Sequence, residues 1–132
     1  MIAPSPLNFP DLRGLTLLVV DDNEDAVEVL SMFLEICGAA VLVARTAMGG
    51  LTYVDVAPKL DLVITDLSMP LMDGVEFVHT IRRHPTPSRR SLPVIALTGF
   101  PEDFVKSQSV FNAFLRKPVD LDRLTATIQS LV

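Results

Sequence analysis

The sequence contains a single cysteine, Cys37, so the chain cannot form an internal disulfide or a site that needs several thiolates. That scarcity suits a reducing, intracellular location. No stretch approaches the roughly 18 apolar residues that a membrane-spanning helix requires, and the first residues lack the basic start and apolar run of a signal peptide. We therefore expect a cytoplasmic protein that does not insert into a membrane.

Positive charge is also scarce, with 11 Lys and Arg residues against 16 Asp and Glu residues and a net charge of -5. Proteins that bind nucleic acids need clustered positive charge to replace the counterions on phosphates, so we expect no nucleic-acid partner. The length of 132 residues suits one globular domain. Residues 1–13 contain three prolines and are predicted to form an extended arm or linker ahead of a domain over residues 14–132.

Five short apolar runs alternate with helical patterns along the chain. Runs this short and rich in Val, Ile and Leu are typical of strands buried on both faces, as in parallel sheets. The runs cover residues 15–20, 41–44, 61–65, 92–98 and 112–116, and the helical patterns cover about 23–37, 47–56, 74–83, 102–109 and 120–131. This alternation predicts an α/β fold, a doubly wound sandwich with right-handed crossovers.

Local patterns predict further detail within these elements. Asp22 or Asn23 is expected to cap the first helix, and Gly38 to end it. The inward-facing residues are expected to be Val27, Leu30, Leu34 and Ile36 in this helix, and Val75, Val78 and Ile81 in the third. A basic group between the third helix and the fourth strand, Arg82, Arg83, Arg89 and Arg90, is interpreted as a solvated loop.

Chemically useful side chains stand where four of the strands end. Asp21 and Asp22 follow the first strand, Asp66 the third, Thr98 ends the fourth, and Lys117 follows the fifth. Ligands of open α/β sheets bind outside the carboxyl ends of the strands, near the point where the winding reverses. If the strand order is 2-1-3-4-5, the three carboxylates converge at that point.

This residue set favours phosphoryl chemistry with a metal ion. Crowded carboxylates repel one another unless a cation intervenes, and hard oxygen ligands suit Mg²⁺. Lys117 would balance the remaining charge and contact a phosphoryl oxygen, while the Thr98 hydroxyl could hydrogen-bond another. An aspartate such as Asp66 can act as the nucleophile and form an aspartyl phosphate.

Four motifs in this order resemble the receiver domain of two-component response regulators. They are VVDDNED at 19–25, ITDLSMPLMDG at 64–74, LTG at 97–99 and FLRKP at 114–118, and the resemblance covers about residues 15–131. It implies a flavodoxin-like, five-stranded parallel sheet in the order 2-1-3-4-5. It also implies a phosphoacceptor switch in a phosphorelay that acts through protein–protein contacts and is not a turnover enzyme.

The resemblance assigns the metal and acceptor roles residue by residue. Asp66 would accept the phosphoryl group from the phosphohistidine of a histidine kinase or a histidine phosphotransfer protein. Asp22 and Asp66 would bind Mg²⁺ together with the backbone carbonyl of Ser68, and Asp21 would position the ion through water.

The resemblance also implies a switch and a modulating position. Lys117 would contact the phosphoryl group, and its peptide bond to Pro118 would be cis. Thr98 would move toward the phosphoryl group and let Phe114 turn inward. Phe100 would shield the group from water and slow its loss. The stretch from Thr98 to Lys117 is shorter than usual, which predicts a short or irregular helix over 102–109.

Alternative functions remain at this point. A flavin-binding module shares the sandwich, although its phosphate loop would be replaced here by the repelling sequence DDNED at 21–25. An aspartate-nucleophile phosphatase would need a D-x-D spacing after the first strand. A receiver-like interaction module that works without phosphorylation is also open, as is the choice between a free-standing regulator and the C-terminal receiver of a hybrid histidine kinase.

Overall fold

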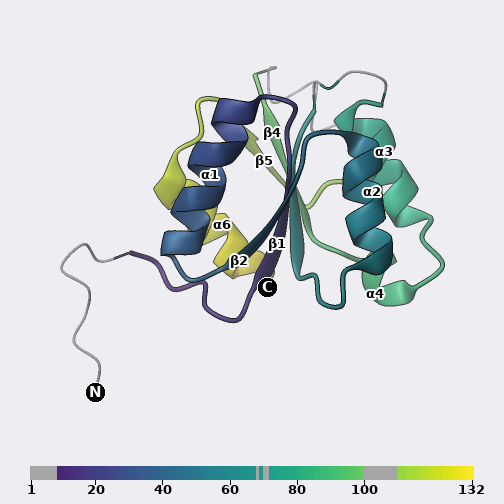
Figure 1. Ribbon diagram of the computed structural model, residues 1–132, viewed down its shortest axis with the longest axis horizontal. Coiled ribbons are helices and arrows are strands. Elements are labelled where there is room, and N and C mark those ends of the chain that lie inside the picture. Colours follow the sequence, from purple (N-terminus) through teal and green to yellow (C-terminus); the bar gives the residue numbers. More distant parts are fainter. Residues whose placement is uncertain (1–8, 68, 70–71, 100–109) are drawn as a thin grey trace.

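The computed structural model describes residues 9–67, 69, 72–99 and 110–132. Within them, parallel strands form one five-stranded sheet in the order β2-β1-β3-β4-β5 (Figure 1). The strands are β1 (Thr16–Val20), β2 (Ala40–Ala44), β3 (Leu62–Asp66), β4 (Val94–Thr98) and β5 (Ala113–Arg116). The predicted strand order and doubly wound architecture are therefore confirmed.

Helices cover both faces of the sheet. They are α1 (Glu24–Ile36), α2 (Ala47–Val56), α3 (Gly74–Arg82), α4 (Pro87–Arg90) and α6 (Leu121–Leu131). Figure 1 shows α1 and α6 on one face and α2, α3 and α4 on the other. Among the described residues, no helix has the length and apolar character needed to span a bilayer. The helix predicted over 102–109 lies outside the described residues.

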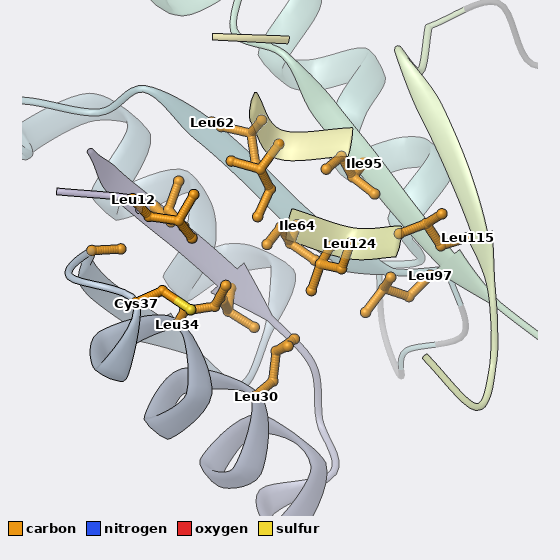
Figure 2. Packing of buried hydrophobic residues seen from close by; sticks show 14 of the residues in the cluster. Leu12, Leu30, Leu34, Cys37, Leu62, Ile64, Ile95, Leu97, Leu115 and Leu124 are labelled. Atoms are coloured by element: carbon orange, nitrogen blue, oxygen red, sulfur yellow. The ribbon is translucent and has the colours of Figure 1, made fainter. Parts of the chain in front are cut away.

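The continuous apolar runs follow from this sandwich, because alternate side chains of a strand enter opposite cores. Along β3, Leu62 and Ile64 point into the core beneath α1 and α6, whereas Val63 points into the core beneath α2 and α3. Figure 2 shows Leu62 and Ile64 packed with Leu34 of α1 and Leu124 of α6. Every residue of β3 and β4 is buried, so neither strand has a solvent face that would select polar residues.

The start of α1 is capped by Asn23, whose side chain accepts a hydrogen bond of 3.0 Å from the backbone N–H of Ala26. Gly38 follows the helix with φ of 101°, a conformation that other residues rarely adopt. The prediction that Ile36 faces inward is wrong, since this side chain is 59% exposed. Ile36 lies two residues beyond the buried Leu34, which is about 200° around the helix.

The segment ahead of β1 packs one residue into the core. Leu12 is fully buried, and its backbone N–H donates a 2.8 Å hydrogen bond to the carbonyl of Cys37. The Phe9 ring packs edge-on against Phe33 of α1 at 6.2 Å. Burial raises the pKa of the Cys37 thiol, which is therefore a neutral core residue. Leu12 is thus the one residue of 9–13 that is buried in the core.

The prediction of a solvated loop is wrong for Arg82 and Arg89. Arg89 lies in α4 and is half-buried, with its guanidinium donating to the Ala57 carbonyl, whereas Arg83 and Arg90 are exposed.

The half-buried guanidinium of Arg82 donates to the carbonyls of Leu92 at 2.7 Å and Val110 at 2.8 Å, and to Asn112 Oδ1 at 2.9 Å. A further bond reaches the Arg90 carbonyl at 3.0 Å. Arg82 therefore ties the end of α3 to the segments that enter β4 and β5.

Replacing Arg82 with lysine is expected to lower the free energy of unfolding by about 1 kcal/mol, because an ammonium cannot reproduce the fork of donors. Denaturant-induced unfolding measures this change. Arg83→Lys is the matched control, since Arg83 is exposed and adjacent in sequence. Equal stability of the two variants would show that the Arg82 network contributes nothing.

Candidate functional site

Three carboxylates meet at the carboxyl edge of the sheet. Val20 of β1 is paired with Thr65 of β3, so the residues that follow them, Asp21 and Asp66, are neighbours. One oxygen from each of Asp21, Asp22 and Asp66 lies within 4.8 Å of those of the other two. The side chains of Asp21 and Asp66 are only 5% and 8% exposed. Two of the three charges are thus largely removed from water.

Lys117 lies against the two buried carboxylates. Its Nζ is 3.3 Å from Asp66 Oδ1 and 3.4 Å from Asp21 Oδ2. Burial alone lowers the pKa of Lys117, but the attraction of Asp66 and Asp21 outweighs it and raises the pKa above its ordinary value. The lysine is therefore charged at neutral pH and offsets part of the carboxylate repulsion.

Backbone hydrogen bonds hold this edge together. The Lys117 N–H donates to the Thr98 carbonyl at 2.8 Å, which aligns the ends of β4 and β5. The N–H of Asn23 donates to Asp21 Oδ1 at 2.9 Å, which orients that carboxylate. The Lys117–Pro118 peptide bond is cis. Thr98 is buried at the end of β4, beside Asp66 at the end of β3.

Gly74 at the start of α3 packs directly on the backbone that carries Asp66. Its N–H donates to the Leu67 carbonyl at 3.0 Å. A Cβ at this position would lie 2.8 Å from the Leu67 Cα and closer still to the Asp66 carbonyl oxygen. Glycine is therefore required here because α3 approaches the backbone of Asp66 and Leu67 so closely.

The predicted switch residue Phe114 lies on β5, where it is half-buried and packs against the core beneath α2 and α3. Its ring centroid is 5.5 Å from that of Phe111. Phe111 carried no assigned role in the sequence analysis. Ser68 and Phe100, the remaining predicted site residues, lie outside the described residues, so their roles stay predictions.

The cluster fits a small divalent cation. Its donors are hard carboxylate oxygens, of the kind that Mg²⁺ prefers, and Asp22 is exposed, so waters or phosphate oxygens can complete a coordination shell. A cavity of about 580 Å³ opens beside the cluster, between α1 and the segment joining β5 to α6. Asp21 and Lys117 both line it, so another molecule can reach them from this side.

The model of the response regulator receiver domain family matches residues 17–129. The chain belongs to this family. An uncharacterized 14.6 kDa protein of Leptolyngbya boryana is 37% identical over 89% of this chain and 90% of its own length. The sensor histidine kinase AtsR of Burkholderia thailandensis is 31% identical over 90% of this chain, which spans only 20% of the kinase. A response regulator receiver protein from Pseudomonas putida has a TM-score of 0.80 at 31% identity, over 88% of this chain and 96% of that one.

Membership of the receiver family decides the class of function. Receiver domains are signalling switches of two-component systems, not turnover enzymes, and their partners are histidine kinases or phosphotransfer proteins. They are generally Mg²⁺-dependent, which agrees with the acidic cluster. The flavin-binding and phosphatase alternatives are therefore set aside.

Proposed function

We propose that this receiver domain is a phosphoacceptor switch, in which Asp66 takes a phosphoryl group from the phosphohistidine of a kinase or phosphotransfer protein. The observation that carries the proposal is the position of Lys117, whose Nζ lies within 3.4 Å of both Asp66 and Asp21. An ammonium held beside Asp66 offers positive charge and a hydrogen-bond donor to an incoming anionic phosphoryl group, and Mg²⁺ on the carboxylates would offset their negative charge. Output would occur through contacts with a downstream protein.

In the proposed step, an oxygen of Asp66 attacks phosphorus in line with the bond to the histidine nitrogen. The P–N bond breaks, a P–O bond forms, and the donor histidine is released with a proton from water. Lys117 would donate a hydrogen bond to a phosphoryl oxygen. Asp21, Asp22 and Asp66 would hold Mg²⁺, which when bound supplies positive charge to the phosphoryl oxygens. The Ser68 carbonyl would complete this set.

The proposed response is a movement of Thr98 and Phe114. The buried Thr98 hydroxyl would hydrogen-bond the phosphoryl group, and Phe114 would turn toward the space beside Thr98. Phe100 would slow the loss of the phosphoryl group by shielding it from water.

We further propose that residues 14–132 form the receiver domain and that it works in the cytoplasm. Its relative AtsR is a histidine kinase, and such a kinase or a phosphotransfer protein is the proposed donor. The buried, unpaired Cys37 suits a reducing compartment. Both a free-standing regulator and the receiver of a hybrid kinase would use the site in the same way.

The proposal predicts a phosphoryl adduct on the intact protein after incubation with Mg²⁺ and acetyl phosphate. The adduct should be absent from Asp66→Asn, because an amide is not a nucleophile of this kind, and absent when a chelator removes Mg²⁺. Intact-mass measurement detects it. Asp73→Asn is the matched control, because Asp73 caps α3 near the site and asparagine caps equally well.

Three results would separate the outcomes. An adduct on the wild type and on Asp73→Asn, but not on Asp66→Asn, would establish the acceptor. An adduct that survives Asp66→Asn would move the acceptor elsewhere. No adduct and no binding of beryllofluoride would leave an interaction module that works without phosphorylation.

A further inference from the structure

Two aromatic rings meet beside β5. The rings of Phe111 and Phe114 have centroids 5.5 Å apart at an interplanar angle of 60°, a geometry that favours attraction between aromatic side chains. Phe111 is 8% exposed and belongs to the same core cluster as Val94 and Ala96 of β4. Phe114 is therefore in contact with a ring that the core already holds.

The backbone on both sides of Phe111 is anchored. The Arg82 guanidinium bonds the carbonyl of Val110, which precedes Phe111, and Oδ1 of Asn112, which follows it. Asn112 also exchanges bonds of 2.9 Å with the backbone of Val94, through its Oδ1 and its N–H. Phe111 is consequently the more firmly held ring of the pair, whereas Phe114 is only half-buried.

The direction of the proposed switch follows from strand register. Phe114 is paired with Ala96, and Arg116 with Thr98, so Thr98 lies two residues closer to the carboxyl edge on the face that Ala96 shares. Asn112 bonds the backbone of Val94, the first residue of β4, so Phe111 lies on the opposite, amino-terminal side of Phe114. A turn of the Phe114 ring toward Thr98 is therefore a turn away from Phe111.

We propose that Phe111 is a positioning residue that holds Phe114 away from Thr98. It thereby sets the free energy that phosphorylation must supply to move Phe114. The inference rests on the proposed function, since it concerns the response of the same site. Separating the two rings costs free energy. Because this separation is coupled to the binding of the phosphoryl group, the cost weakens that binding by the same amount. Phe111 thus makes the switch harder to turn.

The test is a titration of the full chain with beryllofluoride in the presence of Mg²⁺. Phe111→Leu should bind the mimic about 2- to 12-fold more tightly than the wild type, which is the range expected for the loss of one aromatic pair. Phe77→Leu is the matched control, because Phe77 is fully buried in the same cluster and makes no ring contact among the described residues. Its affinity for the mimic should be unchanged.

A double-mutant cycle separates positioning from a general loosening of the core. In a Phe114→Leu background, Phe111→Leu should no longer change the affinity for the mimic. An unchanged or weaker affinity of Phe111→Leu, or an equal gain in the Phe114→Leu background, overturns the inference. If the wild type binds no mimic, both the proposed function and this inference fail; if only the effect of Phe111 is missing, the proposed function stands.

The contact between the two rings can also be measured on the wild type, so that this test does not depend on the folding of a variant. Nuclear Overhauser effects between the ring protons of Phe111 and Phe114 should be present without the mimic and should disappear when Mg²⁺ and beryllofluoride saturate the protein. Ring contacts that persist at saturation would show that Phe114 does not leave Phe111, and the inference would be wrong.

Discussion

Replacing Lys117 with glutamine is expected to slow phosphorylation of Asp66 by roughly 100-fold or more, the usual cost of removing one preorganised donor to a developing anion. Nζ of Lys117 lies 3.3 Å from Asp66 Oδ1, where the phosphoryl charge would arrive. Glutamine keeps a polar end but supplies no positive charge. The initial rate of adduct formation, measured by intact mass at saturating Mg²⁺ and limiting acetyl phosphate, gives the effect.

The affinity for Mg²⁺ should not fall in Lys117→Gln, in contrast to the rate of phosphorylation. The ammonium competes with the metal ion for the negative charge of Asp21 and Asp66, so its removal should leave Mg²⁺ binding as tight or tighter. Arg116→Gln is the control for net charge, because it removes an exposed charge from the adjacent residue. A wild-type rate in Lys117→Gln would exclude the proposed role, and a slow rate caused only by weaker Mg²⁺ binding would contradict the electrostatic argument.

The convergence of the acidic residues could be predicted from the sequence, because it depends on local pattern and one topological rule. Each apolar run predicts a strand, and the carboxyl ends of parallel strands all lie at the same edge of the sheet. The pairing of Val20 with Thr65 then brings Asp21 next to Asp66 without further information. Lys117 follows the edge strand β5, so the same rule brings it to this end of the sheet.

Contacts between distant segments could not be predicted in this way. Arg82 looks like one of several loop arginines until the fold brings Val110, 28 residues later, against its guanidinium. Leu12 follows a proline and an aspartate, and its burial becomes evident only when the fold brings it against the end of α1, where its N–H bonds the Cys37 carbonyl. The contact between the rings of Phe111 and Phe114 likewise depends on a bend of the chain ahead of β5, which the spacing of apolar residues does not predict.

The inward faces of the helices were predicted in outline but not residue by residue. In α3, Val78 and Ile81 are fully buried as expected and Val75 is half-buried against the same core, but Phe77, which is also fully buried, was not predicted. In α1, the exposed Ile36 was wrongly placed in the core. Apolar residues near the edge of a helix face cannot be assigned to the core from spacing alone, since each residue turns the direction by about 100°.

Gly74→Ala is expected to lower the free energy of unfolding by about 2 to 3 kcal/mol and to slow phosphorylation of Asp66. Helix propensity alone predicts the opposite sign, a gain of up to about 1 kcal/mol for replacing a helical glycine with alanine. The added Cβ would lie 2.8 Å from the Leu67 Cα and would also strike the Asp66 carbonyl oxygen, which are backbone atoms that cannot rotate away. Overpacking of this kind typically costs about 1 to 3 kcal/mol, so the clash should dominate.

The matched control is Gly99→Ala, which introduces the same methyl group next to Thr98. No described atom lies within 4 Å of the Cβ that alanine would place there, so stability should change little. Denaturant unfolding and the rate of adduct formation, measured on both variants, separate the two positions. Because the acceptor backbone must shift to admit a Cβ at Gly74, the loss of stability and the loss of phosphorylation rate should occur together. A Gly74→Ala protein as stable as Gly99→Ala would mean that α3 can move away from the backbone of Asp66 and Leu67 at little cost.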